Sequence, residues 1–206
     1  MEFLVLHYSA GLLKPTIDIL CDPQREIKVS SQLVLDVDGT VYELMPYLDG
    51  SCLRARHAGL SWLEQEGKRW EAFNDFAIGI EIINLNGNIF PFTDQQYTTL
   101  AQLLPFLAHH YPALTNPTRI VGHEQIAGWR GKSDPGRCFD WPRMFREAYP
   151  GGNHPAREPI CPALIAESLS KLATFAPTET DPRYPLFFHT LSSLLEQIMD
   201  KRPRST

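Results

Sequence analysis

The residues best suited to chemistry lie in one short stretch, residues 122–136, which reads GHEQIAGWRGKSDPG. It carries an imidazole at His123, a cation at Lys132 and a carboxylate at Asp134. Histidine and aspartate are ordinary zinc ligands, and a catalytic zinc takes three protein ligands and keeps one position open for water. The glycines and the Pro-Gly step predict an irregular loop, without a regular helix, that brings His123 and Asp134 to one point. The third ligand must then come from elsewhere in the chain.

His7 is the candidate for that third ligand. It ends the apolar run 2–7, which predicts a buried strand, and His123 follows a second apolar run at 118–121. If the two strands lie side by side, their carboxyl ends converge on the rim where open sheets place their ligands. Each residue alone has an ordinary alternative, a hydrogen-bonded core histidine at 7 or 123 and a turn residue at Asp134. The case for a metal rests on their conjunction.

Glu81 is the only charged residue in the strand predicted over residues 76–84. A carboxylate buried without a partner costs several kcal/mol, so Glu81 either lies at an exposed edge or has a function. The functional reading is a general base beside the metal, with a pKa raised by burial. Lys132 is either a solvated loop lysine, on a strand-like face with Asp134, or the cation that stabilises an oxyanion.

Turn and capping signals outline the other elements. Asp38-Gly39 predicts a hairpin between residues 32–37 and 41–45. Thr93 and Gln96 form a capping box for a helix that ends near Tyr111. Pro105 within that helix predicts a kink or two shorter helices.

Weaker patterns fill the gaps between these elements. A short helix is expected near residues 15–21, an edge strand at 54–59, a surface loop with one helical turn at 60–74, and a helix from Trp141. The order of strands and helices predicts an α/β fold, a central mixed β-sheet flanked by helices with a helical C-terminal extension.

Bulk properties bound the domain organisation. The chain has 206 residues, 43% of them hydrophobic, which suffices for one main domain at 1–149. Residues 150–206 are expected to form a linker and two amphipathic helices, at 162–175 and 184–200, that pack on the main domain. The four cysteines are scattered without a Cys-x-x-Cys pair and are expected to be reduced thiols: Cys21, Cys52, Cys138 and Cys161.

Charge and hydropathy bound the partners and the location. The formal net charge of -5 argues against a general nucleic-acid binder. No apolar run approaches the roughly 20 residues of a transmembrane span. No secretory leader is visible, which favours the cytoplasm; a trimmed N-terminus would instead allow a periplasmic or secreted protein.

Several motifs occur in a fixed order along the chain: His7-Tyr8-Ser9-Ala10, His57-Ala58-Gly59, Asn74-Asp75-Phe76-Ala77-Ile78-Gly79-Ile80-Glu81-Ile82, Gly122-His123 and Lys132-Ser133-Asp134-Pro135-Gly136. Together they resemble the zinc-dependent N-acetylmuramoyl-L-alanine amidases of the AmpD kind, whose fold is shared by phage amidases and peptidoglycan recognition proteins. The resemblance covers residues 2–146, and its Gly-Ile-Glu and Lys-x-Asp-Pro-Gly elements are the specific ones.

The resemblance implies one zinc ion per chain, bound by His7, His123 and Asp134. It implies that Glu81 activates water and that Lys132 steadies the tetrahedral intermediate. The implied reaction hydrolyses the amide between N-acetylmuramic acid and the L-alanine of the stem peptide, so the expected partner is peptidoglycan or a muropeptide. The third ligand is typically missing in binding-only recognition proteins, so the presence of Asp134 favours an enzyme.

A second set of residues is expected to contact the substrate. Trp62 and Trp129 offer rings for stacking on a sugar, with core packing as the alternative. The chain departs from the family at Gln32, where a histidine is frequent, and in a loop one residue longer around Trp129 and Arg130. The predicted substrate contacts are Tyr8, His57, Trp62, Asn74, Trp129 and Arg130.

Two other functions stay open at this point. One is a non-catalytic peptidoglycan-binding module of the same fold, which would bind without turnover. The other is a different zinc hydrolase, such as a deacetylase or a peptidase, which needs only the metal site. Within the amidase interpretation, a soluble 1,6-anhydro-muropeptide and the intact wall both fit as substrates, and the missing leader favours the soluble fragment and recycling.

Overall fold

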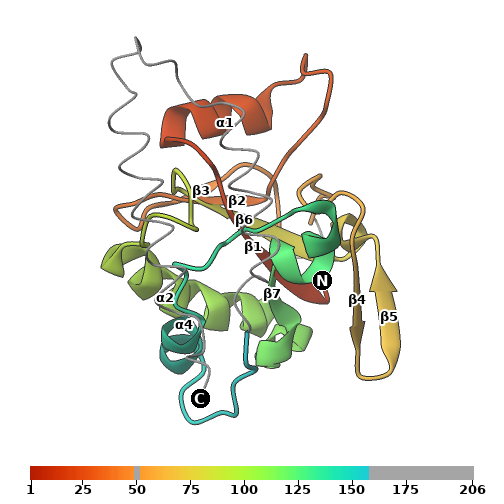
Figure 1. Cartoon of the computed structure of the whole chain (residues 1–206), viewed down its shortest axis with the longest axis vertical. Helices are drawn as coiled ribbons and strands as arrows, with labels where there is room; N and C mark the ends of the chain where they lie inside the picture. Colours follow the sequence, from red (N-terminus) through yellow and green to blue (C-terminus); the bar gives the residue numbers. More distant parts are fainter. Residues whose placement is uncertain (49–51, 158–206) are drawn as a thin grey trace, which may run out of the picture. The chain divides into compact units, whose positions relative to one another are not determined.

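Five strands form the central sheet of the computed structural model, in the order β3-β2-β6-β1-β7 (Figure 1). The central strand β6 (Ala77–Ile82) pairs in parallel with β1 (Phe3–Tyr8) on one side and with β2 (Leu33–Leu35) on the other. β7 (Ile120–Gly122) runs parallel to β1, and β3 (Val41–Glu43) runs antiparallel to β2. The sheet is therefore mixed, and the α/β prediction is confirmed.

The structure describes residues 1–48 and 52–157. Contacts divide the chain after Pro159, and Met1–Pro159 forms the first compact unit. All described elements belong to the first unit, which contains the domain predicted at 1–149. The helices predicted at 162–175 and 184–200, together with Cys161, lie outside the described residues.

Strand alternation divides the sheet into two faces with different tasks. Leu4 and Leu6 of β1 and the isoleucines of β6 pack against helices α2 (Asp94–His110) and α4 (Trp141–Ala148). The alternate residues of β1, Phe3 and Val5, pack on the opposite face. His7 and Glu81 belong to this second series, so the face opposite α2 and α4 carries the polar chemistry.

Helix α1 (Leu13–Cys21) lies on the side of the sheet away from α2 and α4 (Figure 1). The short helix predicted near residues 15–21 is confirmed, with a start two residues earlier. Cys21 and Cys52 are free thiols, as predicted. Among residues 1–48 and 52–157, none of the helices combines the length and apolar character needed to cross a bilayer.

Two sequence predictions were wrong. Residues 54–59 form no strand; Ser30 N donates instead to Arg56 O at 3.3 Å, and Arg56 N to Ser30 Oγ at 2.9 Å. Residues 60–74 hold a two-stranded ribbon of β4 (Trp62–Gln65) and β5 (Lys68–Glu71), followed by one 3-10 turn, Phe73–Asp75. Its charged residues are exposed on both faces, so the ribbon lacks the apolar alternation that marks a half-buried strand.

Helix α2 begins at the predicted capping box. Thr93 Oγ1 accepts from Gln96 N at 3.1 Å, and Gln96 Oε1 accepts from Thr93 N at 3.0 Å. Gln96 Nε2 also donates to Ile83 O at 2.9 Å, which ties the helix start to the end of β6. The helix continues through Pro105 as one element, so the prediction of two shorter helices was wrong.

Replacement of Thr93 by alanine is expected to lower the free energy of unfolding by about 1 kcal/mol, because the backbone N–H of Gln96 loses its acceptor, Thr93 Oγ1. Urea unfolding followed by circular dichroism measures the change. Thr93→Ser keeps the accepting oxygen and is the control, with most of the stability retained. Equal stability of the alanine and serine variants would contradict a capping role.

Candidate metal centre

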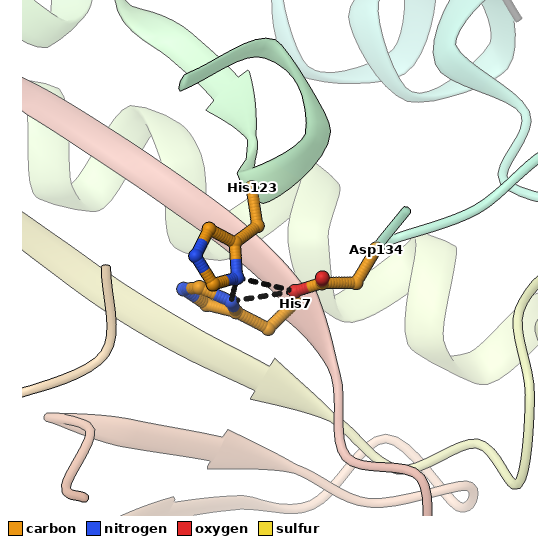
Figure 2. Close-up of side chains that lie close together, drawn as sticks. All are labelled: His7, His123 and Asp134. Atoms are coloured by element: carbon orange, nitrogen blue, oxygen red, sulfur yellow. Dashed lines mark hydrogen bonds and ion pairs between the residues drawn. The ribbon is translucent and has the colours of Figure 1, made fainter. Parts of the chain in front are cut away.

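Three side chains from distant parts of the chain meet at one point (Figure 2). His7 Nδ1 lies 2.7 Å from Asp134 Oδ2 and 3.1 Å from His123 Nδ1, and His123 Nδ1 lies 3.0 Å from the same Asp134 oxygen. The two histidines are buried and Asp134 is mostly buried. Two imidazole nitrogens and one carboxylate oxygen form a ligand set that suits zinc.

The second nitrogen of each histidine has its own partner. His123 Nε2 lies 3.1 Å from Ala58 O, so it carries the proton and leaves Nδ1 as a free lone pair. His7 Nε2 lies 3.0 Å from His57 Nδ1, and His57 Nε2 lies 3.4 Å from Ala77 O. For neutral rings, both hydrogen bonds form only if His57 Nε2 and His7 Nε2 carry the protons. His7 Nδ1 is then also left with a free lone pair. Such outer partners fix ring orientation in metal sites, so the donor set fits a metal ion.

The pKa values of His7 and Asp134 are shifted in directions that favour metal binding. Burial lowers the pKa of His7 to about 4, although the hydrogen bond with Asp134 raises it, so His7 is neutral near pH 7. Burial opposes ionisation of Asp134, but His123 and His7 outweigh it and hold the pKa of this carboxyl well below its usual range. The site therefore presents a neutral imidazole at His7 and an ionised carboxylate at Asp134, the forms that bind a metal.

The imidazole ring of His57 lies directly against the backbone of Gly79 in β6. A Cβ atom on Gly79 would lie 2.5 Å from His57 Cγ, so only glycine allows the ring to lie on β6. Asn74 Oδ1 accepts from His57 N at 3.0 Å and from Ala58 N at 2.8 Å, which fixes the loop behind both histidines.

Glu81 lies beside His7, because the two are paired in the register of β6 and β1. Burial raises the pKa of Glu81 to about 8, the charge of Asp134 adds to this shift, and the charge of Lys132 opposes it. Lys132 is exposed at the cavity wall. The predicted strand-like face for Lys132 and Asp134 was wrong, because residues 131–134 form no strand.

One cavity of about 370 Å³ is lined by all five predicted metal-binding and catalytic residues: His7, Glu81, His123, Lys132 and Asp134. Helix α1 contributes a wall that sequence reasoning missed, through Thr16, Ile19 and Leu20. A neighbouring cavity of about 570 Å³ shares part of this lining and carries five cationic side chains: Lys28, Arg54, Arg56, Arg130 and Lys132.

The residues expected to touch substrate fall in different places. Tyr8 and His57 line the metal cavity, and His57, Asn74 and Arg130 line the basic one. Arg130 Nη2 also donates to Ala58 O at 2.8 Å. Trp62 is absent from the described linings of both cavities; its ring lies 4.4 Å from the Arg69 guanidinium. Trp129 falls in a 3-10 turn, Gly128–Arg130, and its role stays a prediction.

Two local predictions need correction or comment. Residues 122–136 do contain a helix, α3 (His123–Ala127), because Ile126 and Ala127 gain a buried site against Phe3 and Val5. Gln32 is fully buried, where Oε1 accepts from Gly79 N at 2.8 Å and Nε2 donates to Leu53 O at 2.8 Å. It supports β6 and is not among the described residues that line the metal cavity.

Comparison with known proteins identifies the family and the fold. Residues 1–137 match the N-acetylmuramoyl-L-alanine amidase family. The chain belongs to this family. The match includes His7, Glu81, His123, Lys132 and Asp134, and it confirms the resemblance seen in the sequence motifs.

Named members of the amidase family are similar along about two thirds of the chain. The 1,6-anhydro-N-acetylmuramyl-L-alanine amidase AmpD of Haemophilus influenzae is 38% identical over 138 residues, 67% of this chain and 68% of that protein. AmpD of Citrobacter freundii is 37% identical over 128 residues, 62% of this chain and 61% of that protein. A crystal structure of a selenomethionine derivative of AmpD, 32% identical, covers 71% of this chain and 83% of that chain with a TM-score of 0.58.

Replacement of His57 by phenylalanine is expected to weaken zinc binding by about 10–100-fold, because His7 Nε2 loses its partner and the ring its orientation. Competition with a chromophoric chelator measures the zinc dissociation constant. His154→Phe is the matched control, since His154 bonds to Tyr149 O, far along the chain from the three ligands. Unchanged zinc affinity in His57→Phe would refute the outer-partner role.

Proposed function

We propose that the chain is a zinc-dependent amidase that binds one zinc ion through His7, His123 and Asp134 and cleaves muropeptides. Family membership gives the reaction class, hydrolysis of the amide between N-acetylmuramic acid and L-alanine. The observation that carries the zinc proposal is the convergence of three ligand atoms at the wall of a cavity that Glu81 also lines. A zinc ion held there would polarise the scissile carbonyl and lower the pKa of a water molecule.

Glu81 is the proposed general base. It lies beside His7 across the β1–β6 pair and faces the cavity. Burial raises its pKa toward neutrality, the range in which a carboxylate accepts and returns a proton most effectively. Glu81 takes a proton from the attacking water and delivers it to the nitrogen of the leaving L-alanine.

Lys132 is the proposed electrostatic partner of the developing oxyanion. Its ammonium lies at the wall of the same cavity, and its charge already lowers the pKa of Glu81 and of His7. A cation placed before the reaction begins stabilises the tetrahedral intermediate without reorganisation of solvent.

The substrate proposal rests on charge and on the relatives. The five cations of the basic cavity suit the carboxylates of a stem peptide whose amide lies at the metal centre. The similar AmpD proteins are named for a 1,6-anhydro sugar, which favours a soluble recycling fragment over the intact wall. A cytoplasmic location agrees with that substrate and stays a prediction.

Glu81→Gln is expected to lower kcat by at least about 100-fold, because the amide cannot accept the proton. Its metal content is expected to stay near one ion per chain, since Glu81 is not among the three ligands. Glu124→Gln is the matched control: burial also raises the pKa of Glu124 to about 8, but Glu124 is absent from the described lining of the cavity. Wild-type turnover in Glu81→Gln would exclude it as the base.

Product mass spectrometry tests the reaction itself. Zinc-loaded protein is incubated with anhydro-muropeptide and, separately, with purified sacculi, each with and without a chelator. Release of a free stem peptide beginning with L-alanine, only without chelator, is the expected result, with the anhydro-muropeptide as the faster substrate. Binding without cleavage would support the non-catalytic module, and loss of the N-acetyl group or cleavage within the peptide would support another zinc hydrolase.

A further inference from the structure

We infer that Asn88 is a positioning residue for Asp134, the third member of the metal group, an inference that rests on the proposed zinc site. Asn88 Nδ2 donates to Ser133 Oγ at 3.0 Å. Asn88 Oδ1 accepts from Arg137 N at 3.2 Å. One amide side chain therefore holds the loop immediately before Asp134 and three residues after it.

The backbones behind this amide lie in direct contact. Gly87 O accepts from Cys138 N at 2.8 Å. A Cβ atom on Gly87 would lie 2.0 Å from Pro135 O, and one on Gly136 would lie 2.4 Å from the carbonyl carbon of Gly87. Glycine at 87 and 136 is thus required for the turn after β6 to press against the loop that carries Asp134.

The turn that carries Asn88 is held by a relay of asparagines. Asn86 N donates to Asn84 Oδ1 at 2.9 Å, and Asn88 N donates to Asn86 Oδ1 at 3.0 Å. Asn84 is itself buried, and its Nδ2 donates to Phe90 O at 3.1 Å and Pro91 O at 3.2 Å. Side-chain oxygens that accept from the amide two residues on stabilise tight turns.

The relay begins two residues after β6 ends at Ile82 and three after Glu81. It ends on the loop of Asp134, so one rigid turn connects the strand of the proposed base to the third ligand. The two histidines are supported from elsewhere, by His57 and the Ala58 carbonyl. Asn88 thus acts on the loop that carries the carboxylate ligand, and its side chain also bonds to Tyr8, next to His7.

Backbone contacts alone do not replace this support. Glu124 N donates to Asp134 O at 3.0 Å, which fixes the main chain of Asp134 beside α3. The direction of the Asp134 carboxylate depends on the residues around it, and Asn88 holds Ser133 and Arg137 on both sides. Outer residues that orient metal ligands change metal affinity by about 10–100-fold when they are replaced.

The test compares zinc affinity and apoprotein stability in Asn88→Ala. Zinc dissociation constants are measured by chelator competition, ligand geometry by the visible spectrum of the Co²⁺ form, and stability by thermal unfolding without metal. Asn88→Ala is expected to bind zinc about 10–100-fold more weakly, with a changed Co²⁺ spectrum. Ser133→Ala removes one of the two contacts and is expected to give a smaller loss in the same direction.

Asn116→Ala is the matched control. Asn116 Oδ1 accepts from Thr118 N at 3.0 Å, the same kind of bond, at the end of β7 away from His123. It is expected to lose stability like Asn88→Ala but to keep wild-type zinc affinity. Equal zinc affinity in Asn88→Ala and wild type would overturn the inference.

Asp134→Ala provides a reference background. If Asn88 acts through Asp134, the Asn88→Ala change adds no further loss of zinc affinity in the Asp134→Ala protein. Additive losses would overturn the inference, because they would mean a general effect on the fold. Failure of the wild-type protein to bind zinc would refute the proposed metal site instead, and the two failures are therefore distinguishable.

Discussion

The parallel pairing of β1 with β6 and β7 is the constraint on which the site depends. Its register sets His7 opposite Glu81 on one side, while β7 on the other side ends next to His123. A shift of one residue in β1 would turn His7 into the apolar face covered by α2 and α4. The apolar residues of β1 and β6 that fill both faces therefore fix the chemistry as firmly as they fix the fold.

A second layer converts this arrangement into a usable ligand set. Buried imidazoles are costly unless each polar nitrogen has a partner, and here His57 and the Ala58 carbonyl take the outer nitrogens. Asn74 then fixes the loop that carries both partners. These partners engage the outer nitrogens, which leaves the Nδ1 atoms of both histidines turned toward the Asp134 carboxylate (Figure 2).

The sequence was informative where a position followed from strand alternation or from a motif. His7 and His123 end neighbouring strands as predicted, and Glu81 faces away from the isoleucines of β6. It was uninformative where long-range packing decides the outcome. One turn of helix at α3 forms because Ile126 and Ala127 find a buried site, and nothing local to the glycine-rich stretch predicts this.

The hydrogen-bond partners of buried polar side chains could not be predicted from the sequence, because long-range packing also decides them. Asn74 was predicted to contact the substrate and Asn88 looks like an ordinary turn residue in the sequence, and only the fold shows which backbone and side-chain groups they bind. Gln32 stands where the family often has a histidine, and its amide oxygen accepts from the backbone N–H of Gly79. Spacing along the chain predicts which face of an element a residue occupies. It does not predict which distant backbone group the side chain of that residue contacts.

The two carboxylates of the cavity show how one site assigns different roles to the same chemical group. Asp134 contacts both histidines, which hold its pKa well below the usual range, so it stays ionised and suits a permanent ligand. Glu81 is partly buried in β6 and, among the described contacts, makes no bond to either histidine, and desolvation raises its pKa to about 8, so its proton is exchangeable near neutrality. Environments that push two pKa values apart are the usual origin of separate ligand and base roles. Lys132 keeps the difference within a useful range, because its charge opposes the shift of Glu81 while it faces the same cavity.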